Sequence, residues 1–191
     1  MPLLRMRDAT FDAGESSAGP ITLALEEGER AALRCASPQE AKILALLASG
    51  IVKASSGCVL IGDYDPSVQS APCKRIAAFV PHEPLALDER EFARYVAYRA
   101  ALWNVETHRA RAHAELLRKR LSGMHEAFAY PLIGALLGMP KLLVLDRPQS
   151  VYATQIIAVA GRRAFVSTHL DAVSAAAFAP SRVAEIRAGG A

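Results

Sequence analysis

Short apolar segments alternate with helical segments along most of this chain, and this alternation restricts its fold more than any other feature. The clearest segment is Leu142–Leu145, a continuous apolar run typical of a strand that is covered on both faces. Further strands are predicted at Ala31–Cys35, Cys58–Ile61, Ile76–Val80, Ala164–Val166 and Val183–Ile186. Strands that alternate with helices predict an α/β fold with a mostly parallel sheet and flanking helices.

The two ends of the chain add to this plan. Leu3–Phe11 and Ile21–Leu25 are predicted strands joined by a Gly/Ser-rich loop, which indicates an antiparallel β part at the N-terminus. Helices are predicted at Glu40–Ala48 and Asp171–Phe178. A longer helical block, about residues 88–137, forms a helical subdomain within what we expect to be a single domain, residues 1–191.

Composition excludes several classes of protein. A net charge of +3 is too small to indicate a nucleic-acid partner. The cysteines Cys35, Cys58 and Cys73 lack metal-ligand spacing, so we expect free thiols in a reducing compartment. The N-terminus lacks the apolar core of a signal peptide.

One nearly continuous apolar stretch, Ala127–Leu145, is long enough to suggest a membrane helix. It is interrupted by Gly138-Met139-Pro140, which indicates a break. We therefore expect a buried helix followed by a buried strand.

The segment Ala36–Ile43 follows a predicted strand and opens a predicted helix, which is the position of a phosphate-binding loop of the form G-x-x-x-x-G-K-[ST]. Ala36 and Ala41 replace the two glycines, and Ile43 replaces the hydroxyl residue that would bind Mg²⁺. Lys42 alone remains to meet the β- and γ-phosphates. Contact with nucleotide and an ordinary surface lysine at a helix start are both open interpretations of Lys42.

Further segments follow in a defined order along the chain. They are Ser56–Asp63, Phe79–Pro84, Leu121–His125, Pro140–Ser150 and Val166–His169. Together with the loop, this order resembles the nucleotide-binding subunits of ATP-binding cassette (ABC) transporters over nearly the whole chain. The resemblance implies the P-loop NTPase-like ABC ATPase fold.

The resemblance also implies roles for residues at the ends of two predicted strands. Asp146 matches the aspartate that organises Mg²⁺, and His169 matches the histidine that orients the γ-phosphate and water, although a structural role for His169 stays open. Arg147 stands where the family has its catalytic glutamate. A guanidinium stays protonated and cannot act as a general base. We favour a structural ion pair for Arg147, for example with Asp146, over contact with a phosphate.

Other matched positions are weaker. His82 replaces the glutamine that senses Mg²⁺ and couples to the membrane partner, and Phe11 matches the aromatic residue that stacks on adenine. Ser122 and Gly123 keep the start of the Leu-Ser-Gly-Gly-Gln motif, which in the family contacts the ATP held by the opposite subunit. They are predicted to open a helix, where Ser122 acting as a plain N-cap is the alternative.

These substitutions favour a degenerate, hydrolysis-deficient ATP-binding subunit. It would pair with a second nucleotide-binding subunit in a homo- or heterodimer, under an integral membrane permease. It would lie in the cytoplasm, peripheral at the inner face of the cell membrane, with ATP and Mg²⁺ weakly bound or absent at its own site. The alternatives are a non-catalytic scaffold that keeps only the fold and, with less support, an active transporter ATPase.

Overall fold

The computed structural model describes residues 1–14 and 16–185 and contains two sheets. A three-stranded antiparallel sheet has the order β2-β1-β4, and a five-stranded parallel sheet has the order β5-β6-β7-β3-β8. The strands are β1 (Leu4–Ala13), β2 (Ser16–Leu25), β3 (Arg30–Arg34), β4 (Ser56–Ile61), β5 (Ala77–Val80), β6 (Leu142–Leu145), β7 (Ala164–His169) and β8 (Arg182–Glu185). The helices are α1 (Pro38–Ala48), α2 (Ser70–Ile76), α3 (Glu89–Leu102), α4 (Thr107–Arg120), α5 (Glu126–Leu136), η1 (Ser150–Tyr152), α6 (Ala153–Ala160) and α7 (Ala172–Ala177).

The fold class predicted from the sequence is confirmed: a parallel sheet with flanking helices and an antiparallel N-terminal part. The expected Gly/Ser-rich loop between the first strands is wrong in extent, because β1 and β2 remain paired as far as Ala13 and Ser16. Alternate residues of β2, namely Ile21, Leu23 and Leu25, are buried against the core, as a half-exposed strand requires.

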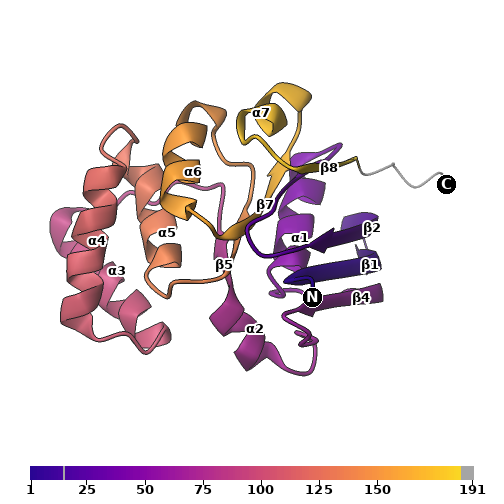
Figure 1. Cartoon of the computed structure of the whole chain (residues 1–191), viewed down its shortest axis with the longest axis horizontal. Helices are drawn as coiled ribbons and strands as arrows, with labels where there is room; N and C mark the ends of the chain where they lie inside the picture. The colour runs from indigo at the N-terminus through magenta and orange to yellow at the C-terminus, as the bar shows by residue number, and fades with distance from the viewer. Residues whose placement is uncertain (15, 186–191) are drawn as a thin grey trace.

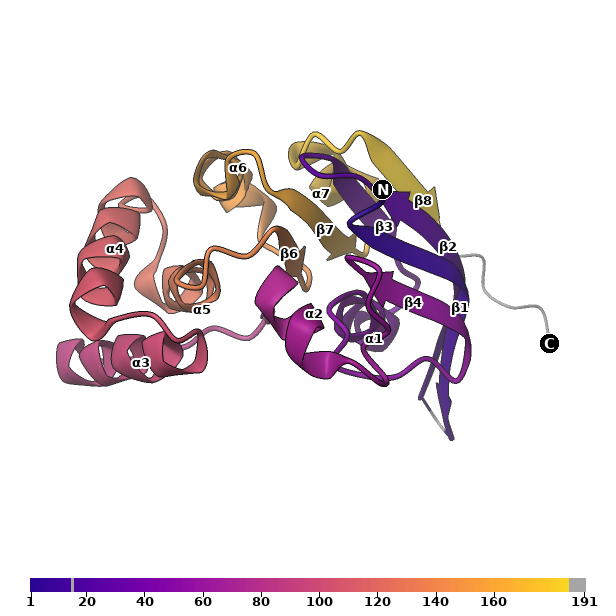
Figure 2. The same ribbon diagram turned by 60° about the horizontal axis from the view of Figure 1, so that its bottom comes forward.

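Helix α1 lies between the two sheets and contacts strands of both (Figure 2). For this reason most of its side chains are buried, including Ile43 and Ala41. A helix that is covered on opposite sides is apolar nearly all round. This packing determines where the segment after β3 lies.

The helical block forms the end of the molecule away from the N-terminal sheet (Figure 1). It was expected to run continuously from Asp88 to Ser122, but α3 ends at Leu102 and α4 begins at Thr107. Asn104 in this break has a φ of 53°, a left-handed conformation that no helix continues through. Asp88 and Glu91 form a reciprocal capping box at the start of α3.

The apolar stretch Ala127–Leu145 forms a buried helix and a buried strand, as expected, with the break between α5 and β6. In the described part of the chain, no helix combines the length and apolar character needed to cross a membrane. The last predicted strand is observed as β8, except that Ile186 lies outside the described residues. Helices α2 and α6 were not expected.

Candidate functional site

Four of the positions singled out from the sequence lie at the carboxyl edge of the parallel sheet. The segment from Ala36 follows β3, His82 follows β5, Asp146 follows β6, and His169 ends β7. Ligands of open parallel sheets bind at this edge, beyond the carboxyl ends of the strands. Main-chain hydrogen bonds tie the strand ends together, from Cys35 to His169 and from Asp146 to Val80.

The segment that was predicted to be a phosphate loop is instead the first turn of a helix. Helix α1 begins at Pro38, two residues earlier than expected, with Ser37 as its N-cap. The Ser37 hydroxyl accepts a hydrogen bond from the Glu40 amide at 3.1 Å. The Glu40 carboxylate turns back and accepts one from the Ala36 amide at 2.6 Å. Two amides of this segment are therefore satisfied by side chains of the chain itself.

Lys42 forms an ion pair with Glu83, the residue after His82. Its ammonium lies 2.9 Å from Oε1 of Glu83, and about half of each side chain is exposed. The hydrogen bond from Lys42 is the main reason that the pKa of Glu83 is lowered. A carboxylate of the chain therefore holds the lysine that would meet a phosphate.

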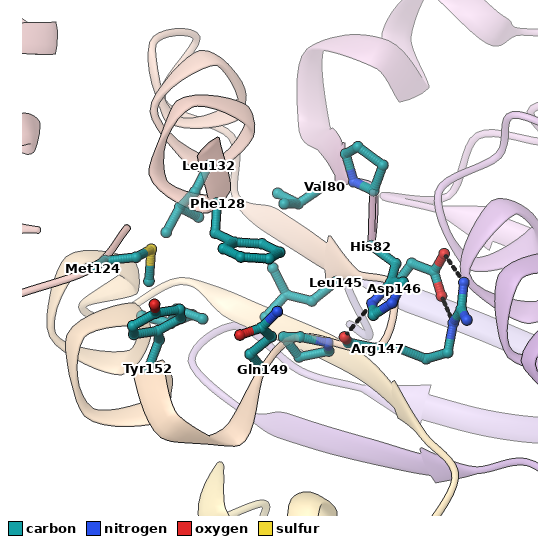
Figure 3. A pocket seen from close by; sticks show the side chains of 13 residues that line it. Val80, His82, Met124, Phe128, Leu132, Leu145, Asp146, Arg147, Gln149 and Tyr152 are labelled. Carbon is teal, nitrogen blue, oxygen red and sulfur yellow. Dashed lines mark hydrogen bonds and ion pairs between the residues drawn. The ribbon is translucent and has the colours of Figure 1, made fainter. Parts of the chain in front are cut away.

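Asp146 is fully buried and lies beside the guanidinium of Arg147 (Figure 3). Nε of Arg147 lies 2.9 Å from Oδ1 of Asp146, and Nη2 lies 3.3 Å from Oδ2. Thr168 adds a longer hydrogen bond to Oδ1 at 3.4 Å. The pKa of Arg147 is raised, chiefly by its hydrogen bonds to Asp146. Both oxygens of the expected Mg²⁺ ligand thus bind a cationic side chain, as the structural interpretation of Arg147 predicted.

The main chain of Arg147 is held on both sides. Its φ is 42°, in the left-handed region that favours glycine. Its amide donates to the Thr168 hydroxyl at 3.0 Å, and its carbonyl lies 2.9 Å from Nδ1 of His82. A carbonyl oxygen only accepts, so His82 carries its proton on Nδ1 and donates it here. His82 therefore supports the loop after β6.

His169 points into the core. It is 1% exposed, its Nε2 lies 2.8 Å from the Ser167 hydroxyl, and its ring lies 5.3 Å from that of Phe178 between centroids. Burial lowers the pKa of His169 from 6.5 to about 4. Burial also raises the pKa of the nearby Cys35 thiol to about 12, with help from Glu40. At neutral pH the His169 imidazole and the Cys35 thiol are therefore both uncharged.

Three further predicted positions belong to the apolar core. Ile43 and Ala41 are buried on α1, facing packed side chains. Phe11 is half-buried on β1 and packs against the same core. The cysteines Cys35, Cys58 and Cys73 are free. In residues 1–14 and 16–185, no group of three or more His, Cys, Asp or Glu side chains is arranged to hold a metal ion.

Ser122 and Gly123 lie in the exposed turn between α4 and α5. The expectation that they open a helix is wrong. Helix α5 begins at Glu126, and its N-cap is His125, whose Nδ1 accepts from the Ala127 amide. The Ser122 N-cap alternative is therefore excluded, and its hydroxyl is on the surface.

A small cavity of about 40 Å³ separates this turn from the charged groups (Figure 3). Apolar side chains line it, among them Met124, Phe128, Leu132, Leu145 and Ile156. Asp146 and Arg147 lie at the end away from Met124, and Gln149 lies between Tyr152 and Arg147. The space suits a few water molecules and is far smaller than a nucleotide.

The fold matches solved structures, although no family model and no curated protein matches the chain. One similar structure is an ATP-binding subunit of an ABC transporter, with 14% sequence identity and a TM-score of 0.76 over 96% of this chain and 85% of that one. Another is CbiO1 from Clostridium perfringens, part of the ABC transporter complex CbiONQ, with 14% identity and a TM-score of 0.70 over 97% of this chain and 85% of that one. Residues 1–14 and 16–185 therefore have the fold of ABC transporter ATP-binding subunits.

Proposed function

We propose that this chain is a hydrolysis-deficient subunit of an ABC-type transporter complex, a single nucleotide-binding domain that regulates or completes the ATP site of a partner cassette. The observation behind this proposal is the bidentate ion pair between Arg147 and Asp146. A protonated guanidinium cannot take a proton from water, and here it also binds both oxygens that a metal ion would need. The chain's own site does not fit Mg²⁺-ATP in this arrangement.

The exposed turn at Ser122 and Gly123 is the feature that serves a partner. It lies outside the paired charges, and the Ser122 side chain is exposed. A γ-phosphate held by a second nucleotide-binding subunit would be a suitable acceptor for the Ser122 hydroxyl. The dimer would bind a membrane permease, in the cytoplasm at the inner face of the cell membrane. The membership of CbiO1 in a transporter complex supports this assignment.

The test uses the complex reconstituted with its partner cassette and permease. Ser122→Ala should lower the ATPase rate of the complex by about tenfold or more, because a donor to transition-state charge is lost. Ser17→Ala is the matched control, because Ser17 is an exposed serine on β2. An unchanged rate with Ser122→Ala would reject the partner role.

The second candidate is a scaffold that keeps only the fold. The two ion pairs, Lys42 with Glu83 and Arg147 with Asp146, favour it equally. The same experiment separates the two, since a scaffold does not need the Ser122 hydroxyl. An active ATPase is the third candidate. It requires the purified chain to release phosphate from ATP at a rate that Asp146→Ala abolishes.

A further inference from the structure

We infer that the chain's own nucleotide site is closed by its own side chains: Glu40 and Glu83 occupy the positions of phosphate groups, and Arg147 occupies the position of the metal ion. This inference deepens the proposed function and rests on it for the identity of the site. It concerns binding, whereas the proposed function concerns the activity of a complex. We call Glu40, Glu83 and Arg147 the three stand-ins, and a different contact supports each of them.

Glu40 satisfies a main-chain donor at the start of α1. Its carboxylate accepts from the Ala36 amide, where a phosphate loop would turn its amides toward an anion. Helix α1 begins already at Pro38, and proline has no amide proton to donate to a phosphate. An incoming phosphate would meet a negative charge at the place where the loop should attract it.

Glu83 takes the place of a phosphate beside the Lys42 ammonium. Its carboxylate holds the Lys42 ammonium at 2.9 Å and comes from a different strand end, 41 residues along the chain. A triphosphate would have to break this pair and accommodate the released carboxylate beside it. Like charges at short range oppose that arrangement.

Arg147 replaces a divalent cation. Its guanidinium contacts both oxygens of Asp146, and its backbone is held by Thr168 and His82. Because Asp146 is fully buried, releasing Arg147 would leave a carboxylate without a cation in the core. Mg²⁺ would have to enter as the guanidinium leaves.

The first experiment titrates the intact wild-type chain with ATP, with and without Mg²⁺, by isothermal titration calorimetry. We expect no saturable binding at millimolar ATP. Saturable binding that Lys42→Ala abolishes would overturn the inference. That result would leave the partner role open, because the partner role is decided by the Ser122 variant in the complex.

The second experiment removes the stand-ins. The double variant Glu40→Ala/Glu83→Gln should bind ATP at least about tenfold more tightly than the wild type. Adding Lys42→Ala should return binding to the wild-type level. Both glutamates are at least partly exposed, and thermal unfolding of each variant verifies that it is folded. A folded double variant that binds no better than the wild type would refute the stand-in role of the carboxylates.

The third experiment concerns the metal position. In the double variant, added Mg²⁺ should leave the affinity for ATP unchanged, because Arg147 still holds Asp146. With Arg147→Gln added, Mg²⁺ should tighten ATP binding by about tenfold. If Mg²⁺ tightens binding equally with and without Arg147, the guanidinium does not occupy the metal position and this part of the inference fails.

Discussion

The guanidinium of Arg147 binds both carboxylate oxygens of the preceding residue, Asp146, with donor–acceptor distances of 2.9 and 3.3 Å. The side chain of Asp146 has no exposed surface, and that of Arg147 is 16% exposed. Two adjacent residues can face each other in this way because Arg147 adopts a left-handed φ of 42°, which folds its side chain back over Asp146. The turn after β6 is thus built around an ion pair.

Arg147→Met should destabilise the chain by about 3 kcal/mol at pH 7, because it leaves a buried carboxylate without its cation. Methionine keeps a Cβ at the same left-handed position, so the backbone strain does not change. Urea unfolding followed by circular dichroism measures the difference. The double variant Asp146→Asn/Arg147→Met should recover most of the loss, since the unpaired charge is gone. Equal losses in the single and double variants would show that the pair contributes packing only.

His169 should make stability depend on pH between about 6.5 and 4. Its pKa is lowered by burial to about 4 in the folded chain, against 6.5 in the unfolded chain. Below pH 6.5 the unfolded chain therefore binds a proton at His169 that the folded chain does not bind, and the free energy of unfolding falls as the pH falls toward 4. Above pH 6.5 the full contribution of the neutral His169 to stability is present.

The measurement compares the wild type with His169→Asn at pH 7 and pH 5. Carboxylates with lowered pKa values, such as Glu83 and Glu126, also stabilise the folded chain less as the pH falls. This loss is the same in both proteins, so the difference between them removes it. The stability advantage of the wild type should shrink by about 2 kcal/mol between the two pH values. An advantage that is constant with pH would contradict the burial of a neutral imidazole.

Gly138→Ala should disrupt the contact between the α5–β6 turn and the end of α3. A Cβ at position 138 would lie 2.0 Å from the ring of Trp103, a distance that forces the ring or the turn to move. We expect a loss of about 1–3 kcal/mol and a shift in tryptophan emission. Trp103 is the single tryptophan of the sequence, so the emission reports this contact directly.

Gly123→Ala is the matched control, because its added Cβ would meet only the end of the flexible Gln155 side chain, at 3.2 Å. Its stability should change by less than about 0.5 kcal/mol, with no change in emission. If both glycine variants gave the same loss, the close approach to Trp103 would not be its cause.

The fold could be predicted where burial leaves a continuous pattern. Leu142–Leu145 is apolar throughout, and Ala31–Cys35 is apolar except at Arg34, because both faces of the parallel sheet are covered. They correspond to β6 and to most of β3. The break between α3 and α4 could not be predicted, since it depends on Asn104 and on packing of Trp103 against Gly138. Helix α2 buries only Cys73 and carries too little periodicity to be recognised.

The position of the site could be predicted from the sequence, but the ion pairs within it could not. Parallel strand ends bring Asp146 and His169 to one edge, as the strand order implies. The pair between Lys42 and Glu83 joins residues 41 positions apart, and no local pattern indicates it. The sequence carries one local signal for the observed helix start: Ser37-Pro38-Gln39-Glu40 has the S-x-x-E form of a capping box with proline at the first helical position. It indicates a helix start where a phosphate loop was expected.

Substitutions at Ser37 test whether this segment is a helix start. Its hydroxyl caps the Glu40 amide, so Ser37→Ala should destabilise the chain by about 1 kcal/mol. Ser37→Gly should cost only a few tenths of a kcal/mol, because glycine is tolerated at N-caps. Gln69→Ala is the control, since Gln69 is the N-cap of α2 and makes no side-chain cap bond. A capped helix is identified if the urea midpoint of Ser37→Ala lies below that of Ser37→Gly and the midpoint of Gln69→Ala is unchanged. If Ser37→Ala leaves the midpoint unchanged, the hydroxyl does not cap α1 and the segment is free to act as a loop.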